Sequence, residues 1–85
     1  MKHYLTLSVS QRLDLLQNAV QRFFYKRNML LLEDQIKSWL KKLDLDYYYT
    51  LDSVSFINSI QAKIYLRKNH MDEHHYQVIL FRYSD

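Results

Sequence analysis

Residues 43–66, LDLDYYYTLDSVSFINSIQAKIYL, decide the fold of this chain because apolar and polar side chains alternate along almost their whole length. One set of positions carries leucine, tyrosine, valine, phenylalanine and isoleucine, with Asn58 as the polar exception. The other set carries mainly acidic residues, serine and lysine. A period of two, rich in β-branched and aromatic residues, is typical of β-strands with one buried face. The stretch therefore predicts a β-hairpin.

The alternation shifts by one residue at Asp52-Ser53, where we predict a two-residue turn. Such a turn would place Leu51 opposite Val54 and Tyr49 opposite Phe56. The apolar side chains of both strands would then share one face of the hairpin.

A third strand is predicted over about residues 74–83, after a polar loop at 69–73. This strand is apolar on both faces, with Tyr76, Val78 and Leu80 on one face and Ile79 and Phe81 on the other. The second half of the chain therefore predicts a three-stranded antiparallel β-meander.

The first half of the chain has the spacing of two amphipathic helices. Ser8, followed three residues later by Gln11, forms a capping-box pattern that predicts a helix over about 9–26. A second helix is predicted over about 31–43, with acidic residues in its first turn and lysines in its last, as the helix dipole favours. The two apolar stripes consist of Val9, Leu13, Leu16, Val20, Phe23 and Phe24, and of Leu32, Ile36, Trp39, Leu40 and Leu43.

Together these elements predict an α+β fold in which two helices precede the meander, with residues 3–7 as a candidate N-terminal edge strand. The alternative is a winged helix-turn-helix domain, in which residues 53–63 form a third helix and residues 64–82 form the wing hairpin. The low helix propensities of the serine, valine and asparagine residues favour strands. The sequence leaves open whether 53–63 is strand or helix.

Length and composition limit the possible functions. The 85 residues, with 48% hydrophobic and 25% charged residues, predict a single compact domain over 1–85. Glycine, proline and cysteine are all absent, which excludes glycine-rich phosphate loops, disulfide scaffolds and cysteine zinc sites. No Ser–His–Asp set or paired-carboxylate cleft is visible, so we predict a non-enzymatic protein without a cofactor.

Charge and targeting signals are weak. The net charge of +3 permits nucleic-acid binding without requiring it, because acidic residues are interleaved along the chain. No apolar segment is long enough to span a membrane, and the N-terminus lacks a signal-peptide pattern, so we predict a cytoplasmic protein. Residues with AT-rich codons outnumber those with GC-rich codons, as in many phages and mobile elements.

Basic and aromatic residues are interleaved in the predicted last two strands. Cations that neutralise phosphates, next to rings that stack on bases, are typical of surfaces that bind single-stranded nucleic acid or RNA. The candidate nucleic-acid-binding residues are Lys63, Tyr65, Arg67, Lys68, Tyr76 and Arg82.

Three consecutive tyrosines, residues 47–49, cannot all face one core if they lie in a strand. We expect Tyr47 and Tyr49 to be buried and Tyr48 to lie outside, next to Ile57 of the paired strand. Exposed tyrosine and isoleucine side chains are typical of protein contacts. Tyr48 and Ile57 are therefore the candidate protein-binding residues.

The segment His70-Met71-Asp72-Glu73-His74, followed by His75, has the H-x-x-E-H spacing of a group of zinc proteases. That chemistry requires a helix, a third ligand and a much larger domain. Here the segment falls in a hairpin loop, so we predict a solvated turn and no metal site. The sequence does not determine whether His70, His74 and His75 bind a metal ion.

If residues 3–7 form a strand, the order strand, helix, helix and three strands resembles that of the RelE/ParE toxin superfamily. Ribonuclease members of that superfamily use Arg, Lys, Tyr or His on the sheet. The resemblance would place this role on Arg67, His74, Tyr76 and Arg82.

The sequence favours a small non-enzymatic protein that acts through protein–protein contact, such as a phage-type or mobile-element regulator or inhibitor. We also expect self-association through an edge strand, because no glycine or proline protects the sheet edges. The alternative is a nucleic-acid-binding domain, either a winged helix or a basic sheet. A RelE/ParE-like ribonuclease toxin is the third candidate.

Overall fold

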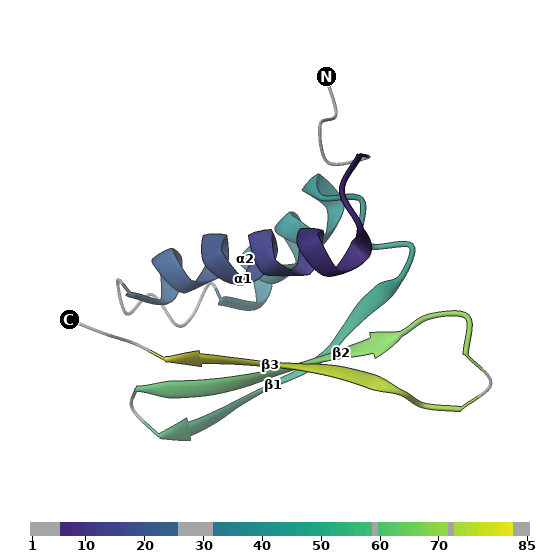
Figure 1. The fold of residues 1–85 in the computed structure, drawn as a ribbon. Coiled ribbons are helices and arrows are strands. Elements are labelled where there is room, and N and C mark those ends of the chain that lie inside the picture. Colours follow the sequence, from purple (N-terminus) through teal and green to yellow (C-terminus); the bar gives the residue numbers. More distant parts are fainter. Residues whose placement is uncertain (1–5, 26–31, 59, 72, 83–85) are drawn as a thin grey trace.

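The computed structural model describes residues 6–25, 32–58, 60–71 and 73–82, with side chains up to Arg22 in the first of these ranges. Two helices, α1 (Val9–Tyr25) and α2 (Leu32–Lys42), precede three strands, β1 (Tyr49–Asn58), β2 (Gln61–Lys68) and β3 (Tyr76–Arg82). The strands form an antiparallel sheet in the order β1-β2-β3. Both helices lie on one side of this sheet (Figure 1). The α+β fold with a three-stranded meander is thus confirmed.

The start of α1 follows from a local hydrogen-bond exchange at Ser8. The Ser8 amide donates to Gln11 Oε1 at 2.9 Å, and the Gln11 amide donates to Ser8 Oγ at 3.1 Å. This reciprocal pair satisfies two donors at the helix end, which confirms the predicted capping box.

The end of α2 is a left-handed cap at Asp44, whose φ is 53°. The Leu45 amide donates to the Leu40 carbonyl at 2.8 Å, and the Asp44 amide donates to the Lys41 carbonyl at 3.1 Å. Leu40 and Leu45 are both buried. The two bonds define a Schellman motif, here without the glycine that usually forms it, and both leucines belong to the core.

A buried arginine of α1 holds this end of α2 in place. Arg12 is 7% exposed, and its Nη1 donates to the carbonyl oxygens of Leu43 at 3.3 Å and Asp44 at 3.1 Å. A cation at a helix C-terminus also matches the negative end of the helix dipole. The guanidinium lies 5.8 Å from the centre of the Tyr48 ring, so it joins three segments.

The first strand begins and ends later than the alternation predicts. Residues 43–48 form the helix cap and turns, and β1 continues through Asp52-Ser53. Leu51 pairs with Leu66 and Ser53 with Tyr65, which leaves Asp52 as an extra residue in a β-bulge. The predicted turn at Asp52-Ser53 is therefore wrong. A bulge and a two-residue turn both shift the alternation by one position, so the pattern does not distinguish them.

The hairpin turn lies further along the chain, between Asn58, which ends β1, and Gln61, which begins β2. Asn58 Oδ1 accepts from the Ile60 amide at 2.9 Å, and Asn58 Nδ2 donates to Gln61 Oε1 at 3.1 Å. An asparagine side chain that bonds the backbone two residues on stabilises a turn. Because 53–58 is strand, the alternative winged helix-turn-helix fold, with 53–63 helical, is wrong.

The predicted N-terminal strand over 3–7 lies partly outside the described residues, which begin at Thr6. Thr6 and Leu7 are not in a strand. The described sheet therefore lacks the additional strand that the RelE/ParE topology requires.

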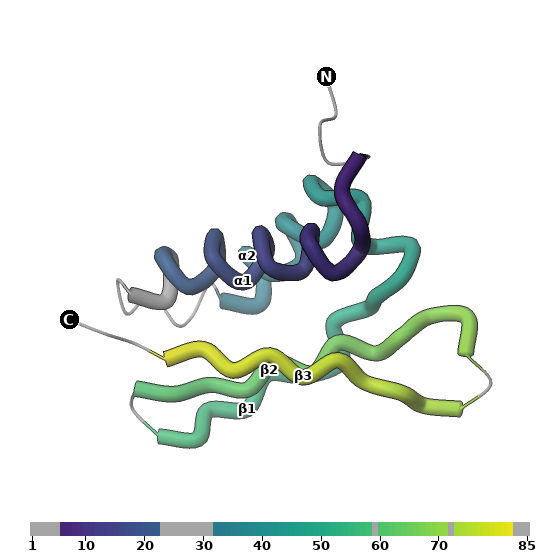
Figure 2. The backbone as a smooth tube through the Cα atoms, in the orientation of Figure 1, coloured from purple at the N-terminus to yellow at the C-terminus, as the bar shows by residue number. Residues whose placement is uncertain are grey.

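The core lies between the helices and one face of the sheet. The predicted helix stripes are confirmed where the side chains are described, whereas Phe23 and Phe24 lie outside the described side chains. The Cα trace measures 34 × 33 × 17 Å, a flat arrangement of two layers that Figure 2 shows from the side. The buried side chains are Leu16, Val20, Leu32, Ile36, Leu40, Leu43, Leu45, Tyr49, Ala62, Ile64, Leu66, Ile79 and Phe81.

Candidate functional site on the open face of the sheet

The side of the sheet that faces away from α1 and α2 is covered by no described element (Figure 1). Cross-strand partners in an antiparallel sheet project to the same face. Since Ile64, Ile79 and Phe81 face the helices, the alternate residues form the other face. We call it the open face. By cross-strand pairing its residues are Thr50, Ser53, Ser55, Asn58, Gln61, Lys63, Tyr65, Arg67, Tyr76, Val78, Leu80 and Arg82.

Apolar side chains form a continuous stripe on the open face, which we call the apolar stripe (Tyr65, Tyr76, Val78 and Leu80). Val78 is 45% exposed and Leu80 47% exposed, and the two tyrosine rings meet edge to face with centres 6.4 Å apart. Tyr65 pairs directly with Val78 across the strands. A contiguous exposed apolar patch on a small domain is typical of an interaction surface.

Basic side chains border the apolar stripe. Lys63 pairs with Leu80, Arg67 pairs with Tyr76, and Arg82 lies at the end of β3. Within the described strands, the one acidic residue beside this face is Asp52, which is exposed in the β1 bulge next to Ser53. The three cations form no ion pair with any described residue. The open face is therefore both apolar and positively charged.

The structure brings together most of the predicted nucleic-acid-binding residues. Lys63, Tyr65, Arg67, Tyr76 and Arg82 all lie on the open face. Lys68 does not, because it pairs with the buried Tyr49 and therefore belongs to the face that the helices cover. Alternation along β2 thus separates Lys68 from Arg67 and from the other candidate residues.

The predicted protein-binding pair is not one site. Tyr48 lies in the turn before β1 and Ile57 lies near the far end of β1, about 30 Å away for nine residues of extended chain. Both are exposed, but the predicted contact between them depended on the turn at Asp52-Ser53, which does not exist. Tyr47, expected to be buried, is 64% exposed.

The histidine segment forms the loop between β2 and β3, as predicted. His70 has a φ of 63° and its ring stacks on Tyr47 with centres 4.5 Å apart. His75 Nε2 lies 3.7 Å from Glu73 Oε2 on an exposed part of the loop. Within the described residues, no three histidine or acidic side chains come close enough to hold a metal ion.

Asn69 attaches this loop to the start of β1. Its amide N–H donates to the Tyr48 carbonyl at 2.8 Å, and its Nδ2 donates to the carbonyls of Asp46 and Tyr47 at 3.3 and 3.2 Å. Its Oδ1 accepts from Thr50 Oγ1 at 2.8 Å. The backbone and side chain of this one residue thus tie the loop end to the start of the strand.

Sequence reasoning missed the central part of the open face. The sequence predicts Val78 and Leu80 together on one face of the last strand but does not indicate that this face is the exposed one. Ile79 and Phe81 on the other face are equally apolar. The one available signal was the cross-strand register, which places Val78 and Leu80 beside Tyr65 and Lys63.

Compared with family models, with curated proteins and with solved structures, the chain shows no significant match. Neither α1 nor α2, the two described helices, has the length and apolar character needed to cross a membrane.

Proposed function

We propose that the chain is a small non-enzymatic binding protein whose open face docks an acidic protein surface. The observation that carries this proposal is the uncovered apolar stripe, bordered by the three cations Lys63, Arg67 and Arg82. Tyrosine, arginine and aliphatic side chains at the centre of a patch are typical of energetically important protein contacts. A cytoplasmic regulator or inhibitor of phage type is the role we propose for such a protein.

An acidic partner is favoured over a second copy of the chain. Two open faces pressed together would bring three cations of one copy against three of the other. Like charges across an interface oppose association, whereas an acidic patch would complement them and accelerate encounter. The partner we expect therefore has an apolar centre with aspartate or glutamate side chains around it.

The test is capture of partners from a lysate of the organism that encodes the chain. Leu80→Asp places a carboxylate in the apolar stripe, and Leu15→Asp is the matched control, because Leu15 is an exposed leucine on α1. We expect Leu80→Asp to abolish capture of a partner that Leu15→Asp retains. Equal capture by both variants, with both folded, would contradict the proposal.

Single-stranded nucleic acid is the second candidate, favoured by the Tyr65–Tyr76 pair beside Arg67. The rings lie at 89° to each other, so they do not form two parallel platforms for neighbouring bases. Val78 and Leu80 also supply no stacking surface. This geometry supports a protein partner better than nucleic acid.

A titration of the labelled protein with oligothymidine separates the two candidates. Nucleic-acid binding predicts amide shifts at Lys63, Tyr65 and Arg67 that weaken steeply with salt. The protein-docking proposal predicts no such shifts at moderate salt. Salt-dependent binding that Arg67→Gln abolishes would place nucleic acid first.

A further inference from the structure

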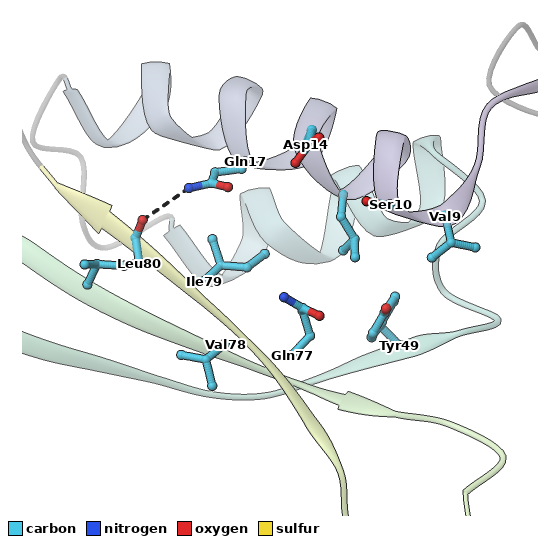
Figure 3. A pocket seen from close by; sticks show the side chains of 10 residues that line it. Val9, Ser10, Asp14, Gln17, Tyr49, Gln77, Val78, Ile79 and Leu80 are labelled. Carbon is cyan, nitrogen blue, oxygen red and sulfur yellow. Dashed lines mark hydrogen bonds between the residues drawn. The ribbon is translucent and has the colours of Figure 1, made fainter.

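A cleft lies between the first half of α1 and β3, on the side of the sheet that the helices cover. Its volume is about 310 Å³, at the lower end of the range for ligand pockets. Figure 3 shows Tyr49 and Gln77 rising from the sheet toward α1, which carries Asp14. Val78 and Leu80 line the cleft as well as belonging to the apolar stripe, so the two surfaces meet along β3. The Val78 side chain itself points to the opposite side of the sheet (Figure 3).

Two glutamines of α1 form hydrogen bonds with some of the backbone groups along the outer edge of β3. Gln17 Nε2 donates to the Leu80 carbonyl at 3.4 Å, and Gln21 Nε2 donates to the Arg82 carbonyl. The Arg82 amide in turn donates to Gln21 Oε1 at 3.3 Å. Unpaired edge groups invite another strand, and these bonds close the C-terminal half of the edge to one.

The N-terminal half of the same edge is not closed in this way. In an antiparallel pair, residues alternate between those that bond the neighbouring strand and those whose backbone groups face outward. Leu80 and Arg82 face outward, and so do Tyr76 and Val78. No described side chain bonds the backbone of Val78, and the cleft adjoins it.

The opposite edge of the sheet is less suited to strand addition. Asp52 and Ile57 are the extra residues of two irregularities in β1, which interrupt its edge. Bulges bend and twist an edge strand away from further pairing. The β2–β3 register, by contrast, is regular from Gln61–Arg82 to Arg67–Tyr76. The regular edge is therefore the one next to the cleft.

The cleft contains one charged side chain. Asp14 is exposed at its upper rim and forms no ion pair with a described residue. Tyr49 is buried below it, and burial raises the pKa of the Tyr49 hydroxyl, which therefore stays protonated at neutral pH. A carboxylate with nearby polar groups suits a ligand with a basic side chain and an extended backbone.

We propose that an extended segment of a partner protein adds to β3 beside Tyr76 and Val78 and places a lysine or arginine side chain against Asp14. The backbone bonds would hold the segment, and the carboxylate would select its charge. This site does not depend on the docking function proposed for the open face. A second copy that paired through its own β3 would present the neutral Gln77, Ile79 and Phe81 on the cleft side.

The probe is the peptide acetyl-Thr-Val-Lys-Val-Thr-amide, titrated into the full-length labelled protein and followed by amide NMR spectra. We expect shifts at Gln77, Val78 and Tyr49, with no shift at the β1 edge residue Val54. The same peptide with glutamate in place of lysine should bind at least about tenfold more weakly, since its charge opposes Asp14.

Two N-methylated forms of the peptide test the backbone bonds. One form carries methyl groups on the amides of the two valines, and the other carries them on the lysine and the second threonine. Only one of these sets faces β3 in a paired strand, because outward and inward amides alternate. We expect one form to lose binding and the other to retain it.

Two variants separate this proposal from that for the open face. Asp14→Asn should remove the preference for the lysine peptide, whereas Arg67→Gln should leave it unchanged. Any one of four results would overturn the proposal. The lysine and glutamate peptides could bind equally, or the two N-methylated forms could have equal effects. The shifts could be confined to β1, or the chain could dimerise through β3 without peptide. None of these outcomes bears on capture through Leu80.

Discussion

The two faces of β3 differ far more in environment than in sequence. On the covered face, Ile64, Leu66 and Phe81 are completely buried under α1 and α2. On the open face, Val78 and Leu80 of β3, the neighbours of Ile79 and Phe81, are nearly half exposed. Each face of β3 is apolar, so composition alone does not make a face into a core. The position of the helices decides which face becomes the core.

The exposed side chains of the open face are apolar surface that folding of the described residues leaves in contact with water. Fully burying a leucine or valine side chain contributes about 1.5–3 kcal/mol. The described elements give Val78 and Leu80 only part of this contribution, and a partner would supply the rest. This is the physical basis for assigning the open face to binding and the covered face to stability.

The largest expected effect is from truncation on the covered face. Phe81→Ala removes a completely buried ring, and we expect it to lower the free energy of unfolding by about 3–5 kcal/mol. Leu80→Ala, one residue away, should change it by less than about 0.5 kcal/mol. Urea denaturation followed by circular dichroism measures both. If Phe81→Ala does not fold, Ile79→Val, expected to cost about 0.5–1.5 kcal/mol, replaces it. Equal losses on the two faces would contradict the assignment.

The next effect concerns the arginine that holds the helices over the covered face. Arg12→Ala removes two hydrogen bonds from a buried cation to the end of α2. We expect a loss of about 1.5–3 kcal/mol in the free energy of unfolding. Arg22→Ala, on the exposed part of α1, serves as the control and should change it by less than about 0.5 kcal/mol. Similar values for both variants would show that Arg12 does not join the helices.

A smaller effect is expected at the start of α1. Ser8→Ala removes one half of the capping box, and we expect a loss of about 1 kcal/mol in the free energy of unfolding. Ser10→Ala, two residues on at an exposed helix position, is the matched control. Thermal unfolding of the two variants measures the difference. A Ser8→Ala variant as stable as Ser10→Ala would show that the cap is dispensable.

The smallest effect appears only at high pH, at the edge of the covered face. Burial raises the pKa of Tyr49 above its ordinary value of 10.0. Above that pH the unfolded chain loses the proton while the folded chain keeps it, so stability falls as pH rises through the folded pKa. Tyr49→Phe should reduce this fall, and urea denaturation at pH values on either side of 10 measures it. Tyr47→Phe, at an exposed ring, should leave it unchanged.

The sequence by itself determined the elements that depend on neighbouring residues. Ser8 and Gln11 set the start of α1 because their bonds span three residues. The apolar stripes of both helices were predicted with their residues, since helical periodicity is a local property. The last strand and the loop that holds His70 are predicted for the same reason, whereas the boundary between the first two strands is not. Five of the six predicted basic and aromatic residues lie together on the open face.

Only the tertiary structure decided the features that two local patterns explain equally well. Asp52-Ser53 is a bulge and not a turn, because Asn58 closes the hairpin further along the chain. That shift separated Tyr48 from Ile57 and removed the predicted contact. Which face of β3 is buried was likewise decided by where α1 and α2 pack, since both faces are apolar. Local bonds specify where an element begins, but only long-range packing selects the face and register that are buried.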